Sequence, residues 1–323
     1  PWRLASLVAV EIRRGLSQHD PSSPRTALTI GAYDGVHTGH RQVISEVCRL
    51  AVERSLTSAV LTFDRHPASV VRPGSAPLLL TDTDQKLEQL AATGVDLTMV
   101  LPFDAERATD SAESFVREVL VGGLGVALVV VGEDFHFGHQ RVGNVALLRD
   151  LGVELDFEVM GLGLVGLDGR PARDHEQVSS TFVRRALARG DLKRANAMLG
   201  RPYEVRGVVD PEATPNLVPG TVRVHIDSAI LLPECGYYAC WSGDGTGSRT
   251  AVAVSVRPLV GGSDAGMCTI TAVPIDAESR LSKGPVRLDF VSHLSMLSTD
   301  DKGAVSSIGR LHDLLGAAGD ALG

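Results

Sequence analysis

The chain is poor in cysteine and in aromatic residues, and it lacks any long apolar run. Its four cysteines among 323 residues form no C-x-x-C pair, which argues against a zinc knuckle or a disulfide scaffold and favours reduced thiols in the cytoplasm. No apolar run approaches the roughly 20 residues that span a membrane. The first residues also lack a signal-peptide layout, so we expect a cytoplasmic protein without a membrane partner.

Net positive charge is missing as well. The formal net charge is −8 at pH 7, which argues against a nonspecific nucleic-acid surface. We therefore expect no nucleic-acid partner, and a site for an anionic nucleotide would have to concentrate positive charge locally. The sequence does not indicate an oligomeric state.

The most informative segment is Gly31–His40, which reads G-A-Y-D-G-V-H-T-G-H. The apolar run Ala27–Ile30 precedes it and a helical pattern follows it, so the segment lies where a strand turns into a helix. Backbone N–H groups at a helix start bind phosphates, and glycines let a ligand come close to the backbone. His37 and His40 add hydrogen-bond donors that suit a phosphate gaining charge. The segment is therefore suited to a nucleoside triphosphate.

Two plainer interpretations of this segment stay open. Short motifs recur freely, and a histidine at a helix start is often only a surface residue or a cap. A zinc pair is a further option, although the segment has no H-E-x-x-H pattern and no carboxylate between the two histidines.

The two parts of the chain follow different patterns. From about Arg25 to Gly200, short apolar runs alternate with helical stretches, which predicts an α/β domain with a parallel, Rossmann-like sheet covered on both faces. Ligands of such sheets bind beyond the carboxyl ends of the strands, which is where Gly31–His40 lies. The expected strands cover residues 27–30, 59–63, 97–101, 127–131 and 153–159, and the expected helices cover residues 39–54, 84–92, 111–121, 144–151, 180–189 and 192–199.

After Tyr203 the pattern changes to short alternating strands separated by Gly, Pro, Ser and Asp, which predicts a small antiparallel β-barrel or sandwich. A final helix is expected near Val305–Ala318. We therefore expect domains at residues 1–202 and 203–323. The expected strands of the second domain cover residues 205–209, 222–226, 237–241, 251–256, 269–273 and 286–291.

Three further motifs follow Gly31–His40 in a fixed order. Thr62–Pro67 reads T-F-D-R-H-P, Val131–Gly138 reads V-G-E-D-F-H-F-G, and Val178–Arg184 reads V-S-S-T-F-V-R. Together the four resemble the prokaryotic bifunctional riboflavin kinase/FAD synthetase family, whose adenylyltransferase motifs run G-x-F-D-G-V-H-x-G-H, F-D-P-H-P, G-x-D/N-F-x-F-G and I-S-S-T-x-I-R. The resemblance covers about residues 25–206.

This resemblance implies a nucleotidyltransferase that moves AMP from ATP to FMN, giving FAD and pyrophosphate. It implies Mg²⁺ held mainly by phosphates and water, with no metal-ligating side chains. The catalytic residues that it implies are His37, His40 and Arg184. The ATP-binding residues that it implies are Gly31, Tyr33, Asp34, Gly39, His40, Ser179, Ser180, Thr181 and Arg184, and the flavin-binding residues are His66, Phe115, Asp134, Phe135 and Phe137.

Taken by themselves, several of these residues have structural interpretations. Ser179 has the residue type and place of a helix cap, and Asp34 suits a turn as well as it suits catalysis. His66 follows a strand, where a purely structural role is common. One of Phe135 and Phe137 is expected to pack in the core.

The first domain departs from the family pattern at three positions. Tyr33 replaces the usual Phe, Arg65 replaces the Pro of F-D-P-H-P, and Val71 stands where relatives often carry an aromatic residue against the flavin. These departures leave the acceptor open, so a modified flavin, another phosphorylated acceptor or a different nucleoside triphosphate are alternatives.

The second domain resembles a riboflavin kinase barrel that has lost its kinase residues. Residues 209–216 read V-D-P-E-A-T-P-N in place of G-R-x-L-G-x-P-T-A-N, and residues 268–273 read C-T-I-T-A-V without the expected glutamate. Ser295 stands near the position of an expected Arg. We therefore expect an FAD synthetase whose degenerate kinase barrel is inactive. The alternatives are a nucleotidyltransferase with another acceptor and a non-catalytic flavin-nucleotide binding protein.

Overall fold

The computed structural model describes residues 10–163, 166, 178–210, 220–243, 248–258, 268–276, 278–296 and 320–322. Residue contacts divide the chain into two compact units. The first consists of residues 1–77 and 83–178, and the second of residues 78–82 and 179–323. The domain boundary expected at residue 202 follows the change in sequence pattern rather than these contacts, and it stays a prediction.

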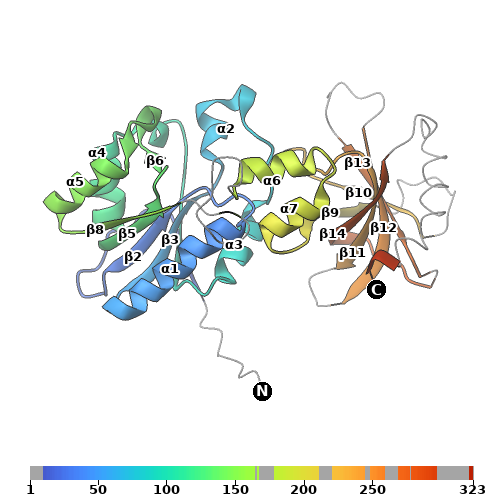
Figure 1. Cartoon of the computed structure of the whole chain (residues 1–323), viewed down its shortest axis with the longest axis horizontal. Helices are drawn as coiled ribbons and strands as arrows, with labels where there is room; N and C mark the ends of the chain where they lie inside the picture. Colours follow the sequence, from blue (N-terminus) through green and yellow to red (C-terminus); the bar gives the residue numbers. More distant parts are fainter. Residues whose placement is uncertain are drawn as a thin grey trace, which may run out of the picture. The chain divides into compact units, whose positions relative to one another are not determined.

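A six-stranded parallel sheet forms the centre of the first unit, as expected from the alternation of apolar runs and helices (Figure 1). Its strand order is β1-β4-β3-β2-β5-β8. All five residues of β2 are buried, which is typical of a parallel strand covered on both faces. The strands are β1 (Glu11–Arg14), β2 (Thr26–Ile30), β3 (Thr57–Phe63), β4 (Leu97–Leu101), β5 (Val126–Gly132) and β8 (Glu158–Leu162).

Helices cover both faces of this sheet. Leu28 and Ile30 of β2 pack with α4, η3 and α5 on one face, whereas Ala27 of the same strand packs against α1 on the other. Helix α3 joins α1 on that second face through Leu90. The helical segments are α1 (Thr38–Arg54), α2 (Pro67–Val71), α3 (Thr83–Ala91), α4 (Ala112–Phe115), the π-helical η3 (Val116–Gly123), α5 (Val145–Leu155), and the short 3₁₀ turns η1 (Pro73–Ser75), η2 (Arg107–Thr109) and η4 (His139–Arg141).

The strand order places a topological switch point between β2 and β5. From β2 the chain proceeds through β3 and β4 toward one edge of the sheet, and then returns to β5 and β8 on the other side. Loops that leave the carboxyl ends of two such neighbouring strands diverge and open a crevice in which ligands bind. The segment Gly31–His40 follows β2, and the segment Glu133–Gly138 follows β5.

Three parts of this unit differ from the sequence-based expectation. Strand β1 pairs with β4 although its residues are mostly exposed and show no apolar run. The expected strand at residues 153–159 is instead the end of α5 followed by β8, since Val153 is 90% exposed on the helix and Asp156 ends it in a left-handed conformation. The two-residue strands β6 (His136–Phe137) and β7 (Gly143–Asn144) form a hairpin too short for periodicity to reveal.

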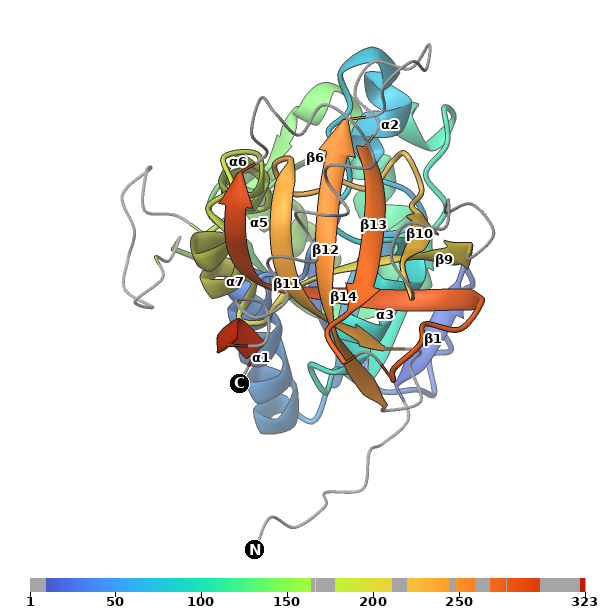
Figure 2. The same cartoon turned by 90° about the vertical axis from the view of Figure 1, so that its right-hand side faces the viewer.

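The second unit is built on a closed six-stranded antiparallel barrel, which confirms the expected second fold (Figure 2). The strands follow the order β10-β13-β12-β11-β14-β9. Leu79 also belongs to this unit and pairs with Ile230. The elements are α6 (Ser180–Leu187), α7 (Leu192–Leu199), β9 (Tyr203–Asp210), β10 (Val222–His225), β11 (Gly236–Gly243), β12 (Arg249–Pro258), β13 (Cys268–Pro274) and β14 (Gly284–Met296).

Two expectations for the second part of the chain lie outside the described residues. They are the helix near Val305–Ala318 and the segment that replaces P-T-A-N at residues 211–216. Within the described part of the chain, none of the helices is both long and apolar enough to cross a membrane.

Candidate active site

The loop between β2 and α1 brings His37 to the start of a helix. His37 is the N-cap of α1, and its Nδ1 accepts a hydrogen bond from the His40 amide at 3.3 Å. Gly39 suits the close packing beside it, because a Cβ at this position would come within 3.3 Å of the His37 ring, tighter than most Cβ contacts. The cap therefore fixes the His37 imidazole, which is only 5% exposed, across the first turn of the helix.

The two imidazoles of the motif stack on each other. The ring centroids of His37 and His40 lie 3.5 Å apart with an interplanar angle of 18°, and the Tyr33 ring meets His40 edge-on at 4.9 Å. Burial and the neighbouring His37 lower the pKa of His40 well below its ordinary range. His40 is therefore a neutral imidazole at pH 7, and its Nδ1 has no hydrogen-bond partner among the described residues.

The backbone that supports these rings is strained. Tyr33 and Val36 both adopt positive φ, at 52° and 35°, in a region that non-glycine residues rarely visit and that is least favourable for a β-branched one. Tyr33 is held there by burial and by a hydrogen bond from its hydroxyl to Thr29 Oγ1 at 2.9 Å. Strain of this kind persists only where the surroundings enforce it, and it is concentrated at functional sites.

The loop after β3 carries the second motif. Asp64 Oδ1 accepts a hydrogen bond from the Phe103 amide at 2.9 Å, which joins the ends of β3 and β4. His66 is the N-cap of α2, with its Nδ1 accepting from the Ala68 amide at 3.1 Å. The structure thus gives His66 a capping role, and its contact with a flavin stays a prediction.

The third motif contributes an aromatic cluster beyond β5. The Phe137 ring stacks with Phe135 at 5.5 Å and meets Phe115 at 5.9 Å. Phe115 and Phe137 are buried members of the main core, whereas Phe135 is only partly buried at its edge. Gly138 is needed beside this cluster, because its φ is +71° and a Cβ there would come within 2.8 Å of the Ala112 backbone.

Asp134 lies on the exposed turn that precedes this cluster. Its carbonyl oxygen is 2.7 Å from His136 Nδ1, which ties the turn to the first residue of β6. The structure leaves the Asp134 carboxylate at the surface beside the aromatic cluster, and a contact of this carboxylate with a nucleotide stays a prediction.

The fourth motif opens α6 and belongs to the second unit. Ser179 is the N-cap of this helix, and its Oγ accepts a hydrogen bond from the Phe182 amide at 3.3 Å. Thr181 is exposed and Ser180 is half-buried in the first turn. One turn later, the Nε of Arg184 donates to the Leu78 carbonyl at 2.8 Å. The capping interpretation of Ser179 is therefore confirmed, and a phosphate-binding role of the segment stays a prediction.

The barrel segments in which the sequence leads one to expect kinase residues contain hydroxyl side chains. Thr271 on β13 lies opposite Ser255 of β12, and Ser295 on β14 lies opposite Tyr237. Two carboxylates of the barrel are engaged in ion pairs, Asp289 with Arg249 at 2.9 Å and Glu204 with Arg206 at 2.6 Å. Asp289 and Glu204 are register partners on the neighbouring strands β14 and β9.

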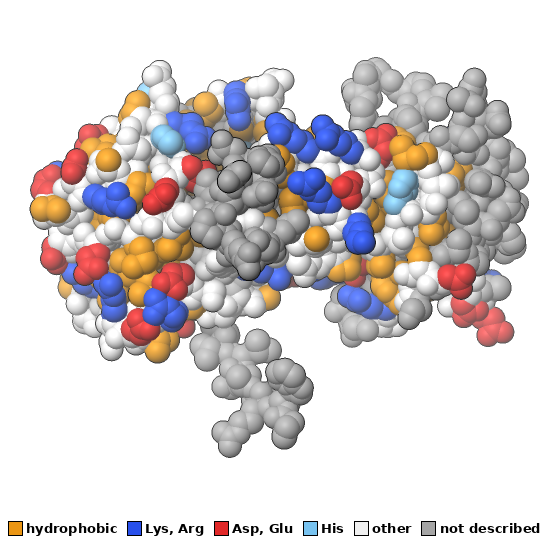
Figure 3. Space-filling view, in the orientation of Figure 1, with side chains coloured by type: hydrophobic (Ala, Val, Ile, Leu, Met, Phe, Trp, Pro, Cys, Tyr) orange, Lys and Arg blue, Asp and Glu red, His pale blue; other side chains and the backbone are white. Residues whose placement is uncertain are grey.

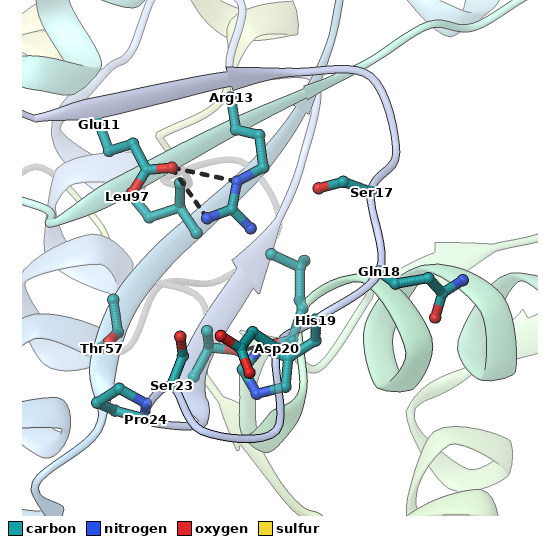
Figure 4. Close-up of a pocket in the computed structure, with 12 residues that line it drawn as sticks. Glu11, Arg13, Ser17, Gln18, His19, Asp20, Ser23, Pro24, Thr57 and Leu97 are labelled. Carbon is teal, nitrogen blue, oxygen red and sulfur yellow. Dashed lines mark hydrogen bonds and ion pairs between the residues drawn. The ribbon is translucent and has the colours of Figure 1, made fainter.

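A cavity of about 400 Å³ lies at the amino-terminal ends of the parallel strands (Figure 4). Thr26, Thr57 and Leu97, the first residues of β2, β3 and β4, line it together with the Glu11–Arg13 ion pair. The four motifs instead lie after the carboxyl ends of strands or at the starts of helices, so this cavity is separate from the candidate site.

Acidic and basic side chains are interspersed over the visible face of the first unit (Figure 3).

Sequence reasoning missed two features of the site. Lys86 of α3 is buried, and its Nζ donates a hydrogen bond to the Phe63 carbonyl at 2.6 Å. A helical sequence pattern alone predicts that a lysine is exposed to solvent. Phe63 and Phe103 meet edge-on at 5.2 Å beside the ends of β3 and β4. Aromatic residues are scarce, Phe63 ends β3 and Phe103 follows β4 by two residues, and this placement was the signal that could have revealed the second pair.

Comparison with known proteins supports the family resemblance that the four motifs indicate. The family model described as FAD synthetase matches residues 19–182. Similar curated proteins are the bifunctional riboflavin kinase/FMN adenylyltransferases of Pseudomonas fluorescens, 39% identical over 204 residues, and of Haemophilus influenzae, 35% identical over 201 residues. The corresponding Escherichia coli protein is 36% identical over 182 residues.

The chain covers less than two thirds of each of these relatives. The aligned part is 62% of this chain and 62% of the Pseudomonas protein, and 56% of both in the Escherichia coli comparison. Over almost its whole length, the chain also resembles the crystal structure of a macrolide-efflux protein from Streptococcus pneumoniae. That match has a TM-score of 0.77 and 21% identity and covers 96% of this chain and 98% of the other, which shows a shared two-domain fold.

Proposed function

This chain belongs to the FAD synthetase family, and on that premise we propose that it is an FMN adenylyltransferase. The observation that carries the proposal is the stacked pair of His37 and His40 at the start of α1, beyond the carboxyl end of β2. Helix starts beyond parallel strands bind phosphates, and a neutral imidazole can donate a hydrogen bond to a phosphate oxygen. The histidine pair is therefore suited to the phosphates of ATP.

The proposed reaction needs no covalent intermediate on the protein. A phosphate oxygen of FMN attacks the α-phosphorus of ATP in line, the bond from that phosphorus to the bridging oxygen breaks, and pyrophosphate leaves. The protein positions two anions and stabilises the charge that develops on the phosphoryl oxygens. We assign that stabilisation to His37 and His40, with Gly31 and Gly39 allowing the nucleotide to approach the backbone and Tyr33 and Asp34 shaping the loop.

Mg²⁺ is proposed to enter with ATP, held mainly by phosphate oxygens and water, and to neutralise part of the phosphate charge. Among the described residues, no group of three or more His, Cys, Asp or Glu side chains is arranged to hold a metal. The proposal therefore assigns the contacts with the ion to the substrate phosphates and water.

FMN is proposed to bind beside the aromatic residues beyond β5. Phe135 is the partly buried ring of that cluster, supported from below by Phe137 and Phe115. A flat, apolar ring system with polar edges suits an aromatic support of this kind. His66 and Asp134 are proposed to border the flavin at the two neighbouring loops.

A product assay tests this function. Purified protein is incubated with Mg²⁺, ATP and FMN, and flavins are separated by chromatography. We expect FAD to accumulate in proportion to the enzyme added. Absence of FAD, with turnover of another phosphorylated acceptor in a parallel panel, would replace FMN by that acceptor.

We further propose that the barrel has lost riboflavin kinase activity. The strand segment 268–273, where the resemblance leads one to expect a glutamate, carries no carboxylate, and the hydroxyls that it offers are too weak as bases to take a proton from riboflavin at neutral pH. The barrel carboxylates Asp289 and Glu204 are held in ion pairs. With riboflavin and ATP we expect no FMN, and FMN formation above the no-enzyme rate would show that the kinase is intact.

Arg184 is proposed to bind ATP phosphates. Because one guanidinium–phosphate contact is lost, Arg184→Ala is expected to raise the KM for ATP by roughly 10-fold or more with little change in the KM for FMN. Arg185, the exposed neighbour one residue along α6, provides the matched control as Arg185→Ala. Equal KM values for ATP in the wild type and in Arg184→Ala would remove Arg184 from the ATP site.

A nucleotidyltransferase that uses a different acceptor is the second candidate. It is favoured by Val71, which is 63% exposed on α2 and gives a flavin no aromatic surface, and by the exposed charge of Arg65. A non-catalytic flavin-nucleotide binding protein is the third, and binding of ATP without turnover would indicate it. We also propose a cytoplasmic location, in keeping with Cys48, Cys235 and Cys240, which form no disulfide within the described residues.

A further inference from the structure

Lys86 occupies an unusual position for a lysine. The chain has four lysines, Lys86, Lys193, Lys283 and Lys302, among 31 basic residues, and Lys86 is the one in the first unit. It lies on α3 with only 7% of its surface exposed. A buried ammonium is expensive compared with an apolar side chain of similar shape, so packing alone does not account for it.

The Lys86 ammonium meets the ends of two strands of the parallel sheet. Its Nζ donates a hydrogen bond of 2.6 Å to the carbonyl of Phe63, the last residue of β3. The carboxylates that act on it are those of Asp34, in the loop after β2, and Asp64, directly after β3. Thr83, at the start of the same helix, donates to the Asp64 carbonyl at 3.1 Å, which fixes α3 to this corner.

Asp34 links the Lys86 ammonium electrostatically to the proposed catalytic loop, because Asp34 is itself part of that loop. It is buried, 4% exposed, and stands three residues before His37 in the strained segment that contains Tyr33 and Val36. A loop held in positive φ needs fixed contacts to stay there. A compact ammonium with three donors can serve a carbonyl and carboxylates from different directions, which a planar guanidinium fork does less well.

We propose that Lys86 is a positioning residue, whose buried ammonium holds the Asp34 side of the loop carrying His37 and His40 against the end of β3. The role in turnover rests on the proposed adenylyltransferase function. Lys86 does not touch the phosphates in this proposal. It acts through Asp34 and the Phe63 carbonyl on the placement of the two imidazoles.

The position also makes the loop sensitive to alkaline pH. Burial lowers the pKa of Lys86 to about 8, against the raising effect of Asp34 and Asp64. The ammonium is therefore present below pH 8 and is lost as the pH rises through that value. Since the neutral amine no longer attracts Asp34, the hold on the histidine loop weakens over the same range.

The first test compares four proteins, the wild type, Lys86→Met, Lys86→Arg and the control Lys193→Met at an exposed position of α7. FAD formation from FMN and ATP is measured between pH 6.5 and 10. We expect Lys86→Met to lower kcat by roughly 10- to 100-fold at pH 7, as for a small misplacement of catalytic groups, with smaller changes in KM. Lys193→Met should match the wild type throughout.

The pH profiles distinguish positioning from a general structural role. The wild-type rate should fall with a midpoint near pH 8, the Lys86→Met rate should show no such step, and Lys86→Arg should shift the step to higher pH because the guanidinium stays charged. A wild-type kcat and the same step near pH 8 in folded Lys86→Met would overturn the proposal.

A second measurement separates this proposal from the proposed function. The ring proton resonances of His37 and His40, assigned with His37→Gln and His40→Gln, are followed by NMR without substrate from pH 7 to 10. His40 has a low pKa of its own, so a shift with a midpoint near 8 that is absent from Lys86→Met would report Lys86. This shift without any FAD formation would leave the positioning role standing and the proposed reaction wrong. FAD formation without the shift would leave the proposed reaction standing and overturn the positioning role of Lys86.

Discussion

Replacing His40 by alanine is expected to lower kcat for FAD formation by about 10²- to 10³-fold, the usual cost of removing one donor that stabilises developing charge. His40 stacks on His37, and its buried Nδ1 has no hydrogen-bond partner among the described residues, so hydrogen bonding within the fold does not account for this imidazole. The position lies in the first turn of α1, where alanine is well tolerated. Steady-state kinetics and the melting temperature, measured together, check both statements.

His37 needs a different substitution, because its ring also caps α1. His37→Ala would remove the cap as well as the imidazole, at about 1 kcal/mol of stability. His37→Asn keeps a capping acceptor, so we expect it to preserve the melting temperature while losing activity to a similar extent as His40→Ala. His225→Ala, at an exposed position of β10, is the control for both. Wild-type rates in both histidine variants would exclude the pair from the mechanism.

The second large effect is on stability and concerns the aromatic cluster. Phe137→Ala is expected to lower the free energy of unfolding by about 3–5 kcal/mol, because the ring is 8% exposed and packs in the main core between Phe115 and Phe135. Denaturant unfolding followed by circular dichroism measures this loss.

Phe135→Ala is the matched comparison, because the same side chain is removed two residues away at the edge of the core. Since Phe135 is only partly buried, we expect a smaller loss of stability and a roughly 3- to 10-fold increase in the KM for FMN, from one lost aromatic contact. Equal effects of the two variants on stability, with no change in the KM for FMN, would show that Phe135 is a core residue only.

The sequence predicted the architecture well because its signals are local. Buried parallel strands such as β2 read as continuous apolar runs, and the barrel strands alternate, so both folds could be inferred from periodicity. Periodicity failed at Val153, where the alternation of a strand occurs within the exposed end of a helix. It also failed at β1, whose pairing with β4 depends on a tertiary contact.

The site was less predictable than the fold. The motif placed His37 and His40 at a helix start, but the stacking of the two rings, and the burial that with His37 lowers the pKa of His40, depend on tertiary packing, which spacing does not encode. The role of Lys86 depends on a carbonyl 23 residues away in the chain. The expectation that one phenylalanine of the F-x-F pair packs in the core agrees with the burial of Phe137, whereas the burial of Phe115 was not anticipated.

The most direct test of the central claim follows the α-phosphorus of ATP. The protein is incubated with Mg²⁺, FMN and ATP labelled at the α-phosphate, and the flavins, nucleotides and pyrophosphate are separated. An adenylyltransferase puts the label into FAD and releases one unlabelled pyrophosphate for each FAD formed. Label that stays in ATP, or that appears only in ADP or AMP while FMN is unchanged, would contradict the account.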